Sequence, residues 1–291
     1  LATIKIGETE QAAILAGEYL FPIRLVNEKC GLDFPAGLLD IIRSGRLETM
    51  NNWYRREGKE QLASCKSLAI PASEARFGPL YRRPRKIWGI GLNYMEHAAD
   101  LAEKAPDTEP ASFMKPDTTI IGPGDPILIP HQSGKTTAEG ELGIIIGREC
   151  KNLREDEVSG VIAGYTTVLD MTAEDILRKN PRYLTRSKSF DTFFSFGPVM
   201  VTPDEVNDLG ALKVATVING RVYRENKVAN MTFPPYYLVS FHSQVMTLLP
   251  GDIISTGTPG AVHIKDGDVV SCTIDGFPSL VNPVVDLKLK H

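Results

Sequence analysis

Short apolar runs separated by turn residues recur from residue 86 to the end of the chain. Most are of strand length and many are rich in Val, Ile and Thr, which favours β-structure. The runs lie at 86–94, 119–122, 126–130, 142–147, 161–170, 197–201, 212–220, 252–259, 268–274 and 284–289. Helical patterns are fewer, at 94–104, 171–180 and 234–247. Many strands with few helices predict an α+β, mainly β fold: a barrel or coiled sandwich rather than alternating βαβ units.

The first 80 or so residues have a different pattern. Their predicted elements are strands at 3–6 and 11–15 and helices at 37–45 and 53–65. The segment 71–86 contains three prolines and many charged residues, which is typical of a connector on a surface. We therefore place a domain boundary near residue 82. The prediction is a small N-terminal α/β accessory domain, 1–82, followed by a larger domain, 83–291.

Charge and composition limit the classes of partner. The net charge of −4 and the pI of about 5.8 give no reason to expect nucleic-acid or anionic-membrane binding. The longest apolar runs are far too short to span a bilayer. The four cysteines are widely scattered, without the short spacing of a zinc site, which suits a reducing compartment. A cytoplasmic enzyme with a small-molecule substrate is the expectation.

An acidic pair precedes one of the most apolar runs. In "AEGELGIIIG", Glu139 and Glu141 lie at the start of a predicted buried strand, 142–147. Residues i and i+2 of a strand point to the same face, so the two Cα atoms would stand roughly 7 Å apart. Two carboxylates placed there repel each other and lose hydration, so they require a neutralising group.

A third carboxylate suggests what that group is. Asp170 ends the apolar run 161–170 as the glutamates begin theirs. Three carboxylates at strand ends form an oxygen-only site that selects Mg²⁺, Mn²⁺ or Ca²⁺ over zinc. Two alternatives stay open on spacing alone. The Glu-Gly-Glu pair is equally a solvated edge, and Asp170 is equally the N-cap of a following helix.

Seven motifs in order across residues 83–262 resemble the catalytic domain of the fumarylacetoacetate hydrolase superfamily. They are "GLNYMEHAAD" (91–100), "FMKP" (113–116), "EGELGIIIG" (139–147), "GYTTVLDMTAED" (164–175), "KSFDTFFSFGPVMVTPDE" (188–205), "NGRVYRENKVANMTF" (219–233) and "LLPGDIISTGTPGAV" (248–262). Each motif alone is weakly specific, whereas the ordered series is strongly specific. The first 80 residues resemble, more loosely, the accessory domain of some members.

The resemblance implies a fold and a metal. The fold is a mixed β-roll around a divalent ion, Mg²⁺ or Mn²⁺, held by residues that match Glu139, Glu141 and Asp170. Lys188 matches a lysine that approaches the substrate oxygens, where a cation helps to stabilise an enolate or oxyanion. Without the family, Lys188 reads as a surface lysine.

A histidine dyad is also implied. His97 matches a histidine that activates water in C–C hydrolases of this family, together with a Glu three residues later. The partner position here is Asp100, one methylene shorter, and Glu96 and Glu103 are nearby alternatives. A solvent-facing helix residue is the other reading of His97.

The resemblance further points to residues of the substrate pocket. Thr258, in "TGTPG", matches a position suited to a substrate carboxylate, and Tyr94 and Lys115 are weaker candidates for the lining. Arg186 could complement an anionic substrate. Relatives commonly have Asn before the third ligand and Arg four residues after it, where this chain has Leu169 and Glu174, so substrate identity is open. The resemblance also implies a homodimer.

The predicted function is metal-dependent hydrolysis of a C–C bond in a β-diketo or 2-oxo acid, through an enolate that the metal stabilises. Because the dyad is altered, decarboxylation of an oxaloacetate-like acid is the second interpretation. Tautomerisation, isomerisation or dehydration of a 2-oxo acid would use the same enolate. A non-enzymatic alternative is a metal-stabilised binding protein that has lost its chemistry.

Overall fold

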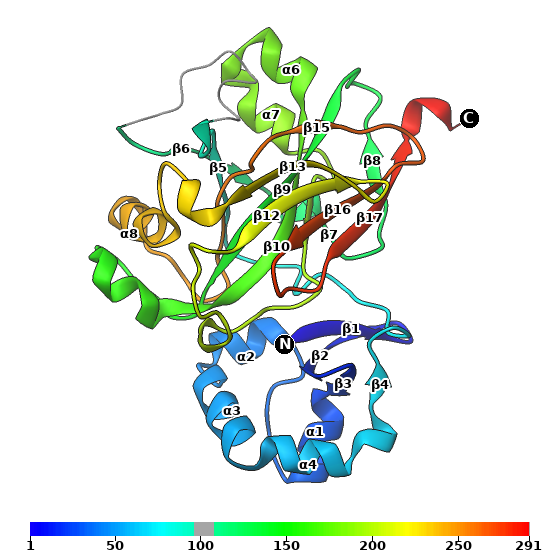
Figure 1. Ribbon diagram of the computed structural model, residues 1–291, viewed down its shortest axis with the longest axis vertical. Helices are drawn as coiled ribbons and strands as arrows, with labels where there is room; N and C mark the ends of the chain where they lie inside the picture. Colours follow the sequence, from blue (N-terminus) through cyan, green and yellow to red (C-terminus); the bar gives the residue numbers. More distant parts are fainter. Residues whose placement is uncertain (96–107, 291) are drawn as a thin grey trace.

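The structure is a computed structural model that describes residues 1–95 and 108–290. Three sheets and a few short helices make up the fold, with the N-terminal elements gathered beneath the larger β-rich part in Figure 1. The prediction of an α+β, mainly β fold with a small N-terminal sheet is confirmed. The helix predicted over 94–104 falls almost wholly outside the described residues.

The N-terminal sheet has four strands in the order β1-β2-β3-β4. They are β1 (Ala2–Ile6), β2 (Thr9–Ala16), β3 (Tyr19–Pro22) and β4 (Ile70–Pro71). The intervening helices are α1 (Ile23–Cys30), α2 (Leu38–Arg43), α3 (Leu47–Trp53) and α4 (Lys59–Ser64), with one π-helical turn, Tyr54–Gly58, between the last two. Their apolar side chains form a core against the sheet, because each helix buries one stripe.

The largest sheet carries the two longest strands at its centre. Its order is β6-β5-β14-β9-β10-β11-β7, and β15 pairs with β9 beside this path. The strands are β5 (Ile87–Gly91), β6 (Ala111–Lys115), β7 (Ile120–Ile121), β9 (Thr136–Ile146), β10 (Ile162–Ala173), β11 (Phe194–Phe196), β14 (Ile253–Ser255) and β15 (Val262–His263). Every residue of β9 and β10 is buried, although both strands contain threonines and acidic residues as well as apolar runs.

A third sheet of five strands packs against β9 and β10. Its order is β13-β12-β16-β17-β8. The strands are β8 (Ile127–Ile129), β12 (Lys213–Ile218), β13 (Arg221–Lys227), β16 (Val269–Ile274) and β17 (Leu280–Asp286). Helices α6 (Glu174–Lys179) and α7 (Leu184–Lys188) follow β10, and α8 (Pro235–Val245) lies on the flank (Figure 1).

The N-terminal elements share a core with the rest of the chain. One apolar cluster contains Phe21 and Ile41 from the first part together with Ile145 and Phe194 from the large sheet. The N–H of Met200 donates a hydrogen bond to the carbonyl of Leu1 over 2.6 Å. The boundary near residue 82 stays a prediction. None of the helices in the described part of the chain is long and apolar enough to cross a membrane.

Candidate metal centre and pocket

Three buried carboxylates meet on one face of the central strand pair. Glu139 and Glu141 lie two apart in β9, so both side chains point the same way. The antiparallel register places Asp170 of β10 directly opposite Glu139. One carboxylate oxygen from each of the three residues lies within 4.8 Å of the others. The convergence predicted from the sequence is therefore present.

The strands extend beyond the ends predicted from the sequence. β9 begins at Thr136 and β10 continues to Ala173, so all three carboxylates lie inside strands and not at their mouths. The alternative in which Asp170 caps a helix is wrong, because the N-cap of α6 is Ala173. The solvated-edge alternative is wrong as well, since Glu139, Glu141 and Asp170 are buried. Because polar residues interrupt the apolar pattern, the sequence predicts strands that are shorter than the observed ones.

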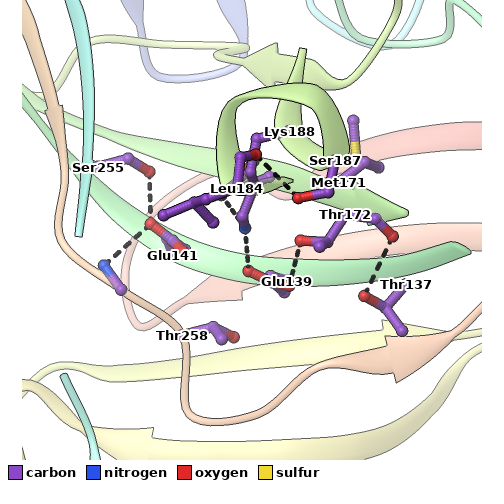
Figure 2. A network of polar contacts seen from close by, with 12 residues as sticks. Thr137, Glu139, Glu141, Met171, Thr172, Leu184, Ser187, Lys188, Ser255 and Thr258 are labelled. Atoms are coloured by element: carbon purple, nitrogen blue, oxygen red, sulfur yellow. Dashed lines mark hydrogen bonds and ion pairs between the residues drawn. The ribbon is translucent and has the colours of Figure 1, made fainter. Parts of the chain in front are cut away.

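Two lysines supply positive charge to this cluster. Lys188, the last residue of α7, donates to Glu139 over 2.8 Å (Figure 2). It also donates to Asp170 over 2.6 Å. Lys115, at the end of β6, donates to the other oxygen of Asp170 and to the carbonyl of Met171. Burial opposes the charge on Lys188, but the nearby carboxylates of Asp170 and Glu139 outweigh it and raise its pKa.

Among residues 1–95 and 108–290, the charges of the cluster do not balance. Two ammonium groups face three carboxylates, which leaves one negative charge in a buried place. Burial, together with the charges of Asp170 and Glu139, raises the pKa of Glu141 to about 8. Burial likewise lowers the pKa of Lys115 to about 8, in spite of its contact with Asp170. The three buried carboxylates therefore need one more positive charge than Lys115 and Lys188 supply.

Further hydrogen bonds orient the carboxylates. Glu141 accepts from the Ser255 hydroxyl and, over 2.9 Å, from the N–H of Gly257, while Glu139 accepts from the Thr172 hydroxyl over 2.6 Å (Figure 2). Gly257 has a φ of +95°, and a Cβ there would lie 2.8 Å from the Cβ of Asn93. Only glycine therefore lets the backbone N–H approach the acid so closely. Ser255 and Thr172 were not predicted, since nothing distinguishes one hydroxyl residue from another in the sequence.

The residue between the glutamates holds the two large sheets together. The N–H of Gly140 donates to the hydroxyl of Thr216 in β12 over 2.8 Å. A Cβ on Gly140 would lie 2.8 Å from the carbonyl oxygen of Ala215. The small residue in Glu-Gly-Glu is thus required by the close approach of β12, a reason that the sequence alone does not reveal.

The donor set fits a hard divalent cation. The three oxygens belong to carboxylates, and their spread of 4.8 Å is close to the roughly 4 Å that two oxygens span across an ion with bonds of about 2.1 Å. The missing positive charge and the oriented carboxylates favour the same conclusion. Glu139, Glu141 and Asp170 would hold the ion, and Lys188 would lie beside it.

A cavity of about 380 Å³ opens directly beside the acidic cluster. Glu139, Thr172, Lys188 and Thr258 contribute polar groups to its wall. Apolar side chains line much of the remainder: Ile90, Leu92, Ala111, Phe113, Leu177, Pro181, Leu184 and Ala261. A mostly apolar cavity with a few convergent polar groups is the usual form of a small-molecule site.

The predicted pocket residues have different positions. Thr258 lines the cavity and exchanges hydrogen bonds with the backbone of Gly260. Lys115 is buried against Asp170, behind the acidic cluster rather than in the cavity wall. Tyr94 is fully buried outside the lining, and burial together with the charge of Glu141 raises its pKa. Arg186 is exposed on α7 and is not brought to the cavity.

The histidine–aspartate dyad is the last part of the predicted site. His97 and Asp100, like the alternatives Glu96 and Glu103, lie outside the described residues, so their roles stay predictions. Of the other histidines within residues 1–95 and 108–290, none contributes to the cavity wall.

The chain matches one protein-family model and is similar to known proteins. The family model described as fumarylacetoacetate (FAA) hydrolase, C-terminal, matches residues 86–285. The mitochondrial oxaloacetate tautomerase Fahd2a of Rattus norvegicus is 34% identical over 224 residues, which cover 74% of this chain and 71% of that protein.

Two solved structures extend this picture. A 5-carboxymethyl-2-hydroxymuconate delta-isomerase from Mycobacterium smegmatis has a TM-score of 0.67 and 38% identity, covering 75% of this chain and 83% of its own. A maleylpyruvate hydrolase from Sphingobium sp. SYK-6, in complex with manganese(II) and pyruvate, has a TM-score of 0.77 and 25% identity. That match covers 98% of this chain and 99% of the hydrolase, and so includes the N-terminal elements.

Proposed function

The chain belongs to the fumarylacetoacetate hydrolase family, and from this premise we propose that it is a divalent-metal-dependent enzyme whose substrate, a 2-oxo acid, reacts through its enol form. The observation that carries the proposal is the buried convergence of Glu139, Glu141 and Asp170 next to Lys188, with Glu139 and Lys188 in the wall of a cavity. A bound divalent cation would act as a Lewis acid toward the keto and carboxylate oxygens of such a substrate. Mg²⁺ and Mn²⁺ both fit the oxygen donors.

We assign the binding of the substrate and the stabilisation of its enolate to residues of the chain itself. Lys188 keeps its proton because its pKa is raised, so it can donate a charge-assisted hydrogen bond to an oxygen that becomes negative in the enolate. Thr258, in the cavity wall, would donate its hydroxyl to the substrate carboxylate in place of the Gly260 carbonyl. The apolar side chains of the cavity exclude water, which strengthens these electrostatic contacts.

Among reactions through an enol, keto–enol tautomerisation or double-bond isomerisation is our first choice. Either reaction needs a proton to be moved and a negative oxygen to be stabilised, and neither needs an activated water molecule. Among the described residues, Lys188 would supply the stabilisation, together with a metal held by the carboxylates. Relatives at 34% and 38% identity that carry the names tautomerase and isomerase support this choice.

Hydrolysis of a C–C bond is the second candidate. It would require a general base for water, the role predicted for His97 with Asp100. The likeness of the whole chain, N-terminal elements included, to a maleylpyruvate hydrolase supports it. The homodimer stays a prediction that light scattering of the purified chain would test.

A substrate panel distinguishes these reactions. Oxaloacetate enol, acylpyruvates and hydroxydienoates are offered with Mg²⁺, with Mn²⁺ or with EDTA. Loss of enol absorbance without release of pyruvate identifies a tautomerase or isomerase. Release of pyruvate from an acylpyruvate identifies a hydrolase, and release of CO₂ from oxaloacetate a decarboxylase. We expect EDTA to abolish turnover. Absence of turnover on the whole panel, with metal bound, would contradict the proposal and favour a binding protein.

A further inference from the structure

A second group of charged residues lines the cavity beside the metal centre. Glu174 and Arg178, one turn apart on α6, both contribute to its wall. They come from a different element than Glu139 and Lys188, which belong to β9 and α7. The cavity therefore presents two separate charged groups with apolar side chains around them. A ligand that fills it meets both.

Glu174 holds two cations at once. Its side chain is only 7% exposed; one oxygen accepts from Nε of Arg178 and the other pairs with Nζ of Lys135 at 2.8 Å. Burial opposes ionisation of Glu174, yet Lys135 and Arg178 keep its pKa below the usual value. One carboxylate against two cations leaves this group of three residues with a net positive charge, and of the three only Glu174 and Arg178 line the cavity. The gained acid at position 174 therefore does not make the wall negative.

Of the two cations paired with Glu174, Arg178 is the one that lines the cavity. Glu174 engages its Nε, and across residues 1–95 and 108–290 no other group accepts a hydrogen bond from this guanidinium. The side chain is 57% exposed and lines the cavity, so its terminal Nη groups face accessible space. A planar guanidinium fixed at one edge offers two parallel N–H donors, which match the two oxygens of a carboxylate.

We propose that Arg178, held in place by Glu174, is a specificity-determining residue that binds the second acidic group of a 2-oxo acid carrying carboxylates at both ends. The inference rests on the proposed function, in which the 2-oxo acid group occupies the metal centre. The distal carboxylate then meets Arg178, while the apolar wall covers the carbon chain between the two ends. Arg178 thus selects diacids over monoacids of equal length.

Calorimetric titration of the Mg²⁺-loaded protein tests this selection without relying on turnover. Three matched pairs are titrated: oxaloacetate with 2-oxobutanoate, 2-oxoglutarate with 2-oxopentanoate, and 2-oxoadipate with 2-oxohexanoate. We expect the diacid of at least one pair to bind about tenfold or more tightly than its monoacid. Arg178→Gln should reduce that preference to within about twofold and leave the monoacid affinity unchanged. Arg178→Lys should retain part of the preference, because lysine keeps the positive charge but lacks the two parallel N–H donors of the guanidinium.

Two further variants distinguish a specific contact of Arg178 from a general effect of positive charge. Arg182→Gln removes an exposed arginine that does not line the cavity, and it should leave the preference as in the unaltered protein. Glu174→Gln should weaken the preference, because Arg178 loses its anchor. Equal binding of both members of every pair, or an unchanged preference in Arg178→Gln, overturns this inference alone. Binding of neither member of any pair overturns the proposed function together with it.

Discussion

Asp170 is the residue at which both cations of the site meet. Lys115 contacts one of its oxygens and Lys188 the other, at 2.6 Å, in a place where Asp170 is only 1% exposed. An ion held by Asp170, Glu139 and Glu141 would share these carboxylates with Lys188. The lysine and the metal would therefore compete for the same negative charge, although the proposed reaction uses both.

That competition leads to a prediction for Lys188→Met. Removal of the ammonium group should lower kcat by roughly 100-fold or more, because the enolate oxygen loses a charged donor. Affinity for Mn²⁺, measured by calorimetry, should stay the same or increase, because a competing cation is gone. Lys179→Met, at an exposed position of α6, is the matched control. An unchanged kcat would exclude Lys188 from the chemistry, and loss of metal binding would show that it serves only to build the site.

At the scale of the elements, the sites follow from how β9 is packed. Its neighbour β10 places Asp170 opposite Glu139. Strand β12, which belongs to the five-stranded sheet, passes close to Gly140. A side chain at position 140 would force β9 and β12 apart. The geometry of the carboxylates thus depends on a contact between sheets that contains no charged group.

Gly140→Ala tests this dependence. The added Cβ would lie 2.8 Å from the Ala215 carbonyl and 3.0 Å from the Thr216 hydroxyl. We expect a loss of about 1–3 kcal/mol in the free energy of unfolding and weaker Mn²⁺ binding. Gly160→Ala is the matched control, because a Cβ there meets nothing within 4 Å. Urea denaturation and calorimetry of the two variants provide the comparison, and equal effects of the two substitutions would refute the packing argument.

The sequence predicted part of this arrangement and missed part of it. Period-two spacing placed Glu139 and Glu141 on one face, and the apolar run 161–170 led to Asp170, because local patterns report local geometry. The contacts with Thr216, Ser255 and Lys115 join residues that are distant in the chain, so periodicity gives no sign of them. The pairing of Glu174 with two cations was missed for the same reason, because it depends on where the side chains of Lys135 and Arg178 point.

At the scale of the whole molecule, one buried histidine links stability to pH. His242 of α8 packs edge-on against Trp88, with ring centroids 5.3 Å apart. Within the described part of the chain, neither of its ring nitrogens has a hydrogen-bond partner. Burial lowers the pKa of His242 to about 4. The folded protein therefore keeps this ring neutral at pH values where the unfolded chain protonates it.

The consequence is a measurable loss of stability in acid. Between pH 6.5 and pH 4 the unfolded chain binds more protons at this site than the folded one, so stability falls as pH decreases through that window. The contribution of His242 amounts to up to about 3 kcal/mol. Urea unfolding followed by tryptophan fluorescence should show a smaller pH dependence for His242→Phe than for the unaltered protein. His131→Gln, at an exposed position, should behave like the unaltered protein. Parallel pH profiles for all three proteins would contradict this assignment.

Anomalous diffraction from a crystal grown with Mn²⁺ tests the central claim most directly. The account predicts one strong anomalous peak per chain, within about 2.2 Å of carboxylate oxygens from Glu139, Glu141 and Asp170. A crystal grown in ample Mn²⁺ that shows no peak there, with Lys188 alone bridging Glu139 and Asp170, would contradict it.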